Sequence, residues 1–391
     1  MTISLEQLQR CSVAIDMGAS RTRVYLKDVG LVVDEASAAA VNTRTGALVA
    51  VGNTVEQMAG RTPSHIRVVR PVGATGITDI EMAQRLLRHL VDHRVRRAWR
   101  FHPNLRAAAC VPHESEPLVQ RAVVDTLAGL GARKVLLVDT LIAAGVGCGL
   151  PVEQAEGMLI VVCGAAMTQI AVLSLGSVVA AEKVMAGGAA VQRALTEHLR
   201  NRHDLVVPGQ AVRQVHHAVA LAVSGETDRA SVRGWDAVTG EVREVAVNVA
   251  DAQAAADAPM LAVLDGIRSV LRRCPPDLVA DIGVRGIMLA GGNATMPGLE
   301  PMLRRSVNLQ VHVAERPETA AILGLGSLLG KGRRAPATYT LPPEQGGSAE
   351  GSPAAKGKRR VRRERARSRP GSRPDAPAPG GRPGHEDARS A

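Results

Sequence analysis

Two segments of the chain share one pattern: an apolar strand, a turn of small residues, and a second apolar strand. Residues 13–26 read VAIDMGASRTRVYL, and residues 159–173 read LIVVCGAAMTQIAVL. A turn of small residues can bring backbone N–H groups up to a phosphate, because no large side chain blocks the approach. The first segment has a carboxylate, Asp16, that could face a metal ion, and the second has Val162 at the matching place. We therefore expect two duplicated halves with a nucleotide in the cleft between them.

The net charge of the chain is concentrated near its C-terminal end. The 391 residues are enough for two domains with substantial cores. With two Trp, two Tyr and one Phe, these cores must consist of Val, Leu, Ala and Ile. Fifteen Lys and Arg and six Asp and Glu lie from residue 331 onward, so residues 1–330 account for only +2 of the net charge of +11. The folded body is therefore nearly neutral.

Cysteine usage and the N-terminal sequence favour a protein of the cytoplasm. The five cysteines are an odd number without CxxC spacing, and each lies in an apolar run, which is typical of buried free thiols. The N-terminus MTISLEQLQR lacks the pattern of a signal peptide. Residues 157–181 carry no charge, but Thr168, Gln169 and two glycines divide them into β-branched runs. This stretch therefore predicts buried strands and no membrane span.

The order of apolar runs and amphipathic stretches predicts an α/β fold with mainly parallel sheets. In the first half, strands are expected at 12–15, 23–26, 30–33, 48–51, 107–111 and 134–138, with helices at 79–97, 114–130 and 141–148. The second half predicts three strands within 158–183, a helix at 188–202, an irregular insert at 206–258, a helix at 252–273, strands at 286–290 and 310–313, and a closing helix at 318–329. Residues 331–391 are poor in aliphatic side chains, which predicts disorder.

A series of motifs gives the chain a family resemblance. The motifs are IDMGASRTRVYLK at 15–27, GRTPSHIRVVRPVGATGITDIEMA at 60–83, CVPHESEPLVQRAVVDTLAGLGARKVLLVDT at 110–140, AAGVGCGLPVE at 143–153, LSLGSVV at 173–179, RGWDAVTG at 233–240, PPDLVADIGVRGIMLAGGNATMPGL at 275–299 and VHVAERPETAAILGLGSLL at 311–329. In order and spacing they resemble the rod-shape-determining bacterial actins of the MreB/Mbl type over about residues 11–330.

The resemblance implies an actin-like fold, shared with Hsp70 and sugar kinases. Domain I would span 11–150 with a smaller subdomain at about 30–75, and the closing helix at 318–330 would return to it. Domain II would span 151–317 with a smaller subdomain at about 206–258, and a disordered basic tail would follow at 331–391. The resemblance also implies binding of ATP with Mg²⁺, polymerisation with itself or with a standard homologue, and a place at the inner face of the plasma membrane. There the family guides the cell-wall synthesis machinery.

Against the family pattern, the expected nucleotide site is eroded at the second turn and at the catalytic position. The family has an Asp where Val162 stands, two glycines where Ala165 and Ala166 stand, and a catalytic Glu where Thr140 stands. Each alanine places a Cβ where a positive φ or a close phosphate would disfavour it, at a cost of about 1 kcal/mol. Asp139 lies one residue early and is expected to point the other way. Loss of a positioned general base lowers a rate by about 10² to 10⁴.

Three turns remain as candidate nucleotide-binding segments. The expected residues are Asp16, Gly18, Ala19, Ser20, Arg21, Gly164, Ala165, Ala166, Gly291, Gly292, Asn293 and Ala294. The third turn, at 291–294, is nearly intact and could pack beneath a base. The family's purine- and ribose-binding segment corresponds to residues 214–217, which contain neither Glu nor Lys. Asp16 is the remaining candidate metal ligand. These losses predict weakened or absent hydrolysis and leave nucleotide binding open.

Two basic segments are candidates for contact with anionic lipid. Trp99 and Phe101 lie among five arginines in a loop that carries lipid-inserting side chains in the family, although they could equally cover the core of their own domain. The run KGKRRVRRERARSR at 356–369 is open to three interpretations: a solubilising tail, a lipid anchor or a nucleic-acid-binding tail. Nucleic acid is the least favoured partner, because no aromatic side chain is interleaved for base stacking.

Three functions remain open at this point. The favoured hypothesis is a membrane-associated actin-like cytoskeletal protein with a degenerate ATPase site. The second is an active ATPase whose hydrolysis drives filament turnover. The third and weakest is an actin-fold small-molecule kinase, for which Asp79 and Asp139 are the available candidate carboxylates.

Overall fold

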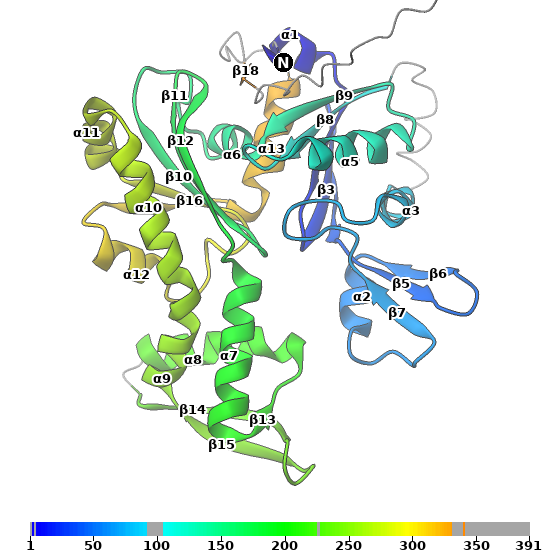
Figure 1. Cartoon of the computed structure of the whole chain (residues 1–391), viewed down its shortest axis with the longest axis vertical. Helices are drawn as coiled ribbons and strands as arrows, with labels where there is room; N and C mark the ends of the chain where they lie inside the picture. Colours follow the sequence, from blue (N-terminus) through cyan, green and yellow to red (C-terminus); the bar gives the residue numbers. More distant parts are fainter. Residues whose placement is uncertain (1, 4, 92–104, 225–226, 331–338, 341–391) are drawn as a thin grey trace, which may run out of the picture. The chain divides into compact units, whose positions relative to one another are not determined.

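The computed structural model describes residues 2–3, 5–91, 105–224, 227–330 and 339–340. The chain divides into two compact units, Met1–Glu344 and Gln345–Ala391, of which the second lies outside the described residues. All elements below belong to the first unit (Figure 1). The predicted boundaries between 11–150, 151–317 and their subdomains stay a prediction.

Two five-stranded sheets with the same topology form the framework. The first has the order β4 (Gly30–Ala36), β3 (Arg21–Leu26), β2 (Val13–Met17), β8 (Arg106–Val111) and β9 (Lys134–Asp139). The second has the order β12 (Ser177–Val184), β11 (Thr168–Ser174), β10 (Met158–Cys163), β16 (Ile287–Ala290) and β17 (Val311–Val313). In each sheet the first three strands are antiparallel and the last two run parallel to the central strand. The halves are therefore duplicated at the level of strand order.

Each large sheet is followed by a helix that packs at the middle of the unit. Helices α6 (Thr140–Gly147) and α13 (Ala320–Leu329) cross closely, because Gly147 lies against the Ala320 carbonyl and Gly324 against the Ala143 carbonyl, with no room for a Cβ. Helix α13 also contacts β2, β3 and β8 of the first sheet. Their apolar faces form one buried cluster with Ile160 and Leu173 of the second sheet.

Two smaller three-stranded sheets extend the framework. The first has the order β6 (Leu48–Val51), β5 (Ala39–Asn42), β7 (Ile66–Val69), with α2 (Asn53–Met58) beside it. The second has the order β13 (Leu205–Val206), β14 (Arg229–Asp236), β15 (Val242–Asn248). Helices α7 (Gly188–His203), α8 (Gly209–Ser224) and α9 (Val249–Asp257) pack against this second sheet through a core of Leu, Val and Ala (Figure 1).

The remaining helices cover the large sheets or join strands. They are α1 (Leu5–Gln9), α3 (Ile80–Leu90), α5 (Pro117–Ala128), α10 (Leu261–Arg273), α11 (Pro276–Arg285) and α12 (Leu299–Ser306), with the 3₁₀ turns η1 (Ala258–Met260) and η2 (Pro317–Thr319). Helix α10 lies along β11 and β12. Among the described residues, no helix combines the length and the apolar character needed to span a membrane.

Several sequence predictions need correction. The helix expected at 252–273 is two helices, α9 and α10, separated at Pro259 by the 3₁₀ turn η1, because proline lacks the N–H that an interior helical position requires. The helix expected from 114 begins at Pro117, since Glu114 has a φ of +45°.

Part of the predicted tail forms a backbone pairing. Tyr339–Thr340 (β18) pairs antiparallel with Thr2–Ile3 (β1), within the segment for which the composition predicts disorder. Strand pairing uses backbone groups, so an argument from buried apolar area did not detect it. The rest of residues 331–391 lies outside the described residues.

The cysteines are free thiols, as expected. Cys11, Cys110 and Cys163 are buried, and Cys148 and Cys274 are partly buried. Burial raises the pKa of Cys11 and Cys148 to about 11 and that of Cys163 to about 12. These three thiols are therefore protonated and unreactive at neutral pH.

Candidate nucleotide site

The two small-residue turns have the same backbone geometry. The Gly18 N–H donates to the Arg21 carbonyl at 2.9 Å, and the Gly164 N–H donates to the Met167 carbonyl at 2.9 Å. Each bond closes the hairpin between two antiparallel strands, β2 with β3 and β10 with β11. Beside the first turn Asp16 pairs with Arg23, and beside the second Val162 pairs with Gln169. Asp16 and Val162 are therefore equivalent positions, as the sequence pattern predicts.

The alanines of the second turn cause no backbone strain. Among the described non-glycine residues, positive φ occurs at Asp28, Glu114, Leu175 and Asp204, and so at none of the turn residues. The expected cost of Ala165 and Ala166 from a positive φ is therefore wrong. Gly18 and Gly164 also lack a positive φ, and what they provide is space, because a Cβ would lie 3.2 Å from the Arg21 carbonyl oxygen and 2.7 Å from the Met167 carbonyl oxygen, respectively.

Both turns leave backbone donors available. The carbonyl of Gly164 accepts from the Gly188 N–H at 3.2 Å and from Asn293 Nδ2 at 2.9 Å, and the carbonyl of Ala165 accepts from the Ala189 N–H at 2.8 Å. These bonds direct the carbonyls of the second turn toward α7 and the third turn. Within the described part of the chain, the N–H groups of Ala19, Ser20, Ala165 and Ala166 have no hydrogen-bond acceptor. Such groups are suited to phosphate oxygens.

The third turn is held by backbone bonds from both sides. Gly291, at the end of β16, has a φ of +88°, a conformation that glycine adopts without strain. Its N–H donates to the Pro317 carbonyl at 2.7 Å, and the Asn293 N–H donates to the Cys163 carbonyl at 3.0 Å. The end of β10, the third turn and the 3₁₀ turn η2 before α13 are thereby joined at one place.

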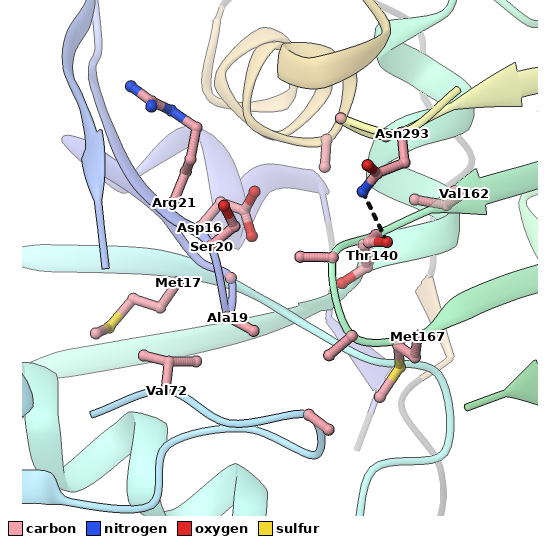
Figure 2. A pocket seen from close by; sticks show the side chains of 18 of the residues that line it. Asp16, Met17, Ala19, Ser20, Arg21, Val72, Thr140, Val162, Met167 and Asn293 are labelled. Carbon is pink, nitrogen blue, oxygen red and sulfur yellow. Dashed lines mark hydrogen bonds between the residues drawn. The ribbon is translucent and has the colours of Figure 1, made fainter. Parts of the chain in front are cut away.

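One cavity of about 820 Å³ brings most of the predicted site residues together. Its lining includes Asp16, Gly18, Ala19, Ser20, Arg21, Thr140, Val162, Gly164, Ala165, Ala166, Gly291, Gly292 and Asn293. Figure 2 shows Asp16, Ala19 and Ser20 on one side, with Val162, Met167 and Asn293 on the other. Ala294 is 1% exposed and packs in the core of the second half. Trp99 and Phe101 lie outside the described residues.

Sequence reasoning missed several charged residues of this cavity. They are Arg23, Asp34, Glu56, Arg70, Arg213 and Glu318. Residues 214–217, expected at the purine and ribose, do not line it, because Val215 and His216 face the core and Arg213 lies on the cavity side of α8. Burial lowers the pKa of His216. The helical period of apolar residues at 212, 215 and 219 was the signal that could have placed Arg213 correctly.

The first turn carries a compact network of charges. Arg21 Nε lies 2.5 Å from Asp34 Oδ1, and Arg23 Nε lies 3.1 Å from the same oxygen. Asp16 is opposite Arg23 on the neighbouring strand. Desolvation in the cavity raises the pKa of Asp16, Arg23 opposes this shift, and Asp34 adds to it.

Neither Thr140 nor the neighbouring Asp139 replaces the missing glutamate as a general base. The Thr140 hydroxyl donates to the Val111 carbonyl at 2.8 Å. Asp139 points away from the cavity, as expected: one oxygen accepts from the Leu141 N–H at 2.8 Å and the other lies 2.5 Å from His113 Nδ1. Asp139 is therefore the N-cap of α6 and does not line the cavity.

The donor groups fit a phosphate better than a divalent cation. The available backbone N–H groups at both turns match phosphate oxygens. Mg²⁺ is usually held by one or two carboxylates with phosphates and water. Here Asp16 adjoins Arg23, and Val162 offers no ligand. Among the described residues, no group of three or more His, Cys, Asp or Glu side chains could hold a metal ion.

Comparison with known proteins agrees with this architecture. The family model described as "MreB/Mbl protein" matches residues 10–335. The chain is 32% identical over 322 residues to the cell shape-determining protein MreB of Escherichia coli strain K12, covering 81% of this chain and 92% of that protein.

Solved structures show the same fold. The crystal structure of MreB5 of Spiroplasma citri bound to ADP superposes with a TM-score of 0.74 at 23% identity, covering 80% of this chain and 94% of that chain. The MamK double helical filament gives a TM-score of 0.63 at 20% identity, covering 81% and 97%. The fold is therefore actin-like. With the family model spanning nearly all of the folded body, the chain belongs to the MreB/Mbl family of cell shape-determining, actin-like filament proteins.

Proposed function

We propose that this protein is a nucleotide-binding cytoskeletal polymer at the inner membrane surface, where it helps to organise cell-wall synthesis, and that it hydrolyses ATP slowly or not at all. The observation that carries the proposal is the pair of matched turns lining one cavity. Both turns offer backbone N–H groups, whereas only the first retains a carboxylate. Binding through backbone groups and loss of catalytic side chains can coexist in such a site.

Slow hydrolysis follows from the chemistry at positions 162 and 140. Val162 provides an alkyl side chain where the family has an Asp, and the Thr140 hydroxyl is bound to a backbone carbonyl. Neither group can polarise water or accept its proton at neutral pH. A positioned general base typically contributes a factor of about 10² to 10⁴ to the rate. The rate of ATP hydrolysis would therefore be lower by about this factor than in a family member with both groups.

Nucleotide binding and polymerisation are supported by relatives of the same fold. MreB5 has been crystallised with ADP, and MamK forms a double helical filament. We extend both properties to this chain, with either itself or a standard homologue as the filament partner. Bound nucleotide would be ATP or ADP, with the phosphates at the two matched turns and the base toward the third turn.

Phosphate release and sedimentation together test the proposal. Purified protein with ATP and Mg²⁺ is expected to pellet as polymer while releasing phosphate at a rate near the background. Phosphate release at the rate of E. coli MreB, measured in parallel, would favour the alternative of an active ATPase. Failure to pellet with ATP, with ADP or with added standard homologue would contradict polymerisation.

Membrane association rests on the basic segments of the sequence. Sedimentation with anionic liposomes is expected to capture the full chain, and neutral liposomes are the matched control. Trp99→Ala with Phe101→Ala, and separately a chain ending at Gly330, are expected to lower this capture. Unchanged capture in both variants would contradict the membrane role as proposed.

A kinase function is disfavoured by the two candidate carboxylates. Asp79 accepts from the Met82 N–H at 2.8 Å as the N-cap of α3, and Asp139 caps α6. Neither lines the described cavity. A kinase would need one of them free to face a substrate hydroxyl.

A further inference from the structure

The wall of the cavity at the first turn is electrically balanced by the protein itself. Asp16 and Arg23 are directly opposite on β2 and β3, so their side chains lie on one face of the sheet. Asp34 on β4 lies 2.5 Å from Arg21 Nε and 3.1 Å from Arg23 Nε. Two carboxylates and two guanidinium groups therefore share this wall, and a divalent cation at Asp16 would lie beside the Arg23 guanidinium.

Arg23 is a largely buried cation in the lining of the cavity. Arg23 is 7% exposed and lines the cavity. Its Nε lies 3.1 Å from Asp34 Oδ1 in an ion pair but makes no hydrogen bond. A buried donor without an acceptor is unfavourable, and a guanidinium carries five donors. Phosphate oxygens are the acceptors with which guanidinium forms its strongest hydrogen bonds.

The opposite wall cannot supply the missing metal ligand. At the position equivalent to Asp16 stands Val162, and its cross-strand partner Gln169 accepts from the His113 N–H at 2.9 Å. Gln169 Oε1 is thus committed to a bond within the protein. At the second turn a metal ion would find no carboxylate ligand, and at the first turn it would lie beside a cation.

We propose that this cavity binds its nucleotide without a divalent cation, and that Arg23 is the positive group that faces the phosphates in the metal's stead. This inference rests on the proposed nucleotide binding. A nucleoside diphosphate carries more negative charge without Mg²⁺ than with it. Arg23 therefore binds the metal-free form at least as tightly as the Mg²⁺ complex.

Equilibrium dialysis of ADP against the full chain tests the proposal, with Mg²⁺ in one buffer and EDTA in the other. The two dissociation constants are expected to agree within about tenfold, with any difference in favour of EDTA. A loss of affinity greater than about tenfold in EDTA overturns the proposal. Absence of binding in both buffers contradicts the proposed nucleotide binding itself, so the two failures are distinguishable.

Arg23→Gln tests the role of the guanidinium. The variant is expected to bind ADP about tenfold more weakly in both buffers, since a charge-assisted bond is lost. Arg121→Gln is the matched control, because Arg121 is exposed on α5 and, among the described residues, pairs with Asp125 alone. Unchanged affinity of a folded Arg23→Gln variant overturns the role of Arg23.

Val162→Asp provides a second test that does not depend on the folding of the Arg23 variant. A carboxylate at the second turn restores a ligand on the opposite wall, so Mg²⁺ is expected to strengthen ADP binding by about tenfold. Val162→Asn is the uncharged control and is expected to show no such preference. Equal affinity of Val162→Asp in both buffers overturns the claim that this missing carboxylate abolishes metal dependence.

Discussion

The turn between β2 and β3 and the turn between β10 and β11 share a backbone and differ in chemistry. In both, a glycine N–H donates to the carbonyl three residues later at 2.9 Å. Beside the first turn the strands pair Asp16 with Arg23, two charged groups, and beside the second they pair Val162 with Gln169, which are neutral. The same hairpin is thus flanked by a charged pair in one half and by a neutral pair in the other.

The difference shows that the geometry of such a turn does not depend on its catalytic side chains. The hairpin is maintained by backbone hydrogen bonds and by buried apolar strands on both sides, so Asp and Val are equally compatible with it. Binding through N–H groups and catalysis through carboxylates are therefore separable properties. In the second half, the polar side chain of the pair makes a different contact. Gln169 accepts from the His113 N–H and so joins β11 to the loop after β8.

The largest expected effect comes from restoring the two lost catalytic groups of the cavity, one in each half. Val162→Asp combined with Thr140→Glu is expected to raise ATP hydrolysis by about 100-fold or more, because a general base and a second carboxylate return to the cavity. Phosphate release measures it, and Val162→Asn with Thr140→Gln is the uncharged control. Equal rates in the two double variants would mean that the site lacks more than these two groups.

Replacing one glycine of each turn by alanine should destabilise the protein to different extents in the two halves. Alanine at Gly164 would place Cβ 2.7 Å from a backbone oxygen, and at Gly18 it would lie 3.2 Å away. We expect Gly164→Ala to lower the free energy of unfolding by about 2 kcal/mol and Gly18→Ala by less than about 1 kcal/mol. Urea unfolding of both variants checks the order, which would be reversed if the second turn can relax more easily.

A smaller loss is expected from the hydrogen bond of Gln169. Gln169→Leu removes the acceptor of the His113 N–H, which is part of a half-buried loop, and should lower the free energy of unfolding by about 1 kcal/mol. Gln169→Glu retains an oxygen at the same place and serves as the control. Urea unfolding that leaves Gln169→Leu as stable as the wild type would show that water replaces the bond.

The smallest effect is a pH dependence confined to the first half. Desolvation raises the pKa of Asp16 above its ordinary value of 3.8, so the folded chain binds this proton more tightly than the unfolded chain. The stabilisation by Asp16 is therefore greatest at acid pH and is lost as pH rises through the folded pKa. Asp16→Asn should gain stability relative to the wild type between about pH 4 and pH 7.

Urea unfolding at several pH values measures this difference. Val162→Asn is the matched change in the second half, and its difference from the wild type should not vary with pH, because neither side chain titrates. A stability difference for Asp16→Asn that falls with rising pH would mean that Arg23 outweighs desolvation at this carboxyl.

The strands were the part of the fold most accessible to prediction. Buried runs at 107–111, 134–138 and 158–183 became β8, β9 and the hairpin strands β10, β11 and β12, because fully buried strands need continuous apolar residues. Helix ends were less accessible: Pro259 divides the helix expected at 252–273, and α5 starts at Pro117. The strands β5 and β7 were not predicted, although β6, which has the same length, was.

By itself the sequence determined the duplicated turns, the loss of a carboxylate at Val162 and the family of the chain, because these depend on residue identity along one short segment or on the order of segments. Only the tertiary structure decided that Arg23, Asp34, Arg213 and Glu318 meet in the same cavity. It also decided that Thr140 and Asp139 bond to their own half. These contacts depend on how strands and helices that are distant in sequence pack together, and on which face of its element each side chain lies. A local sequence pattern determines neither.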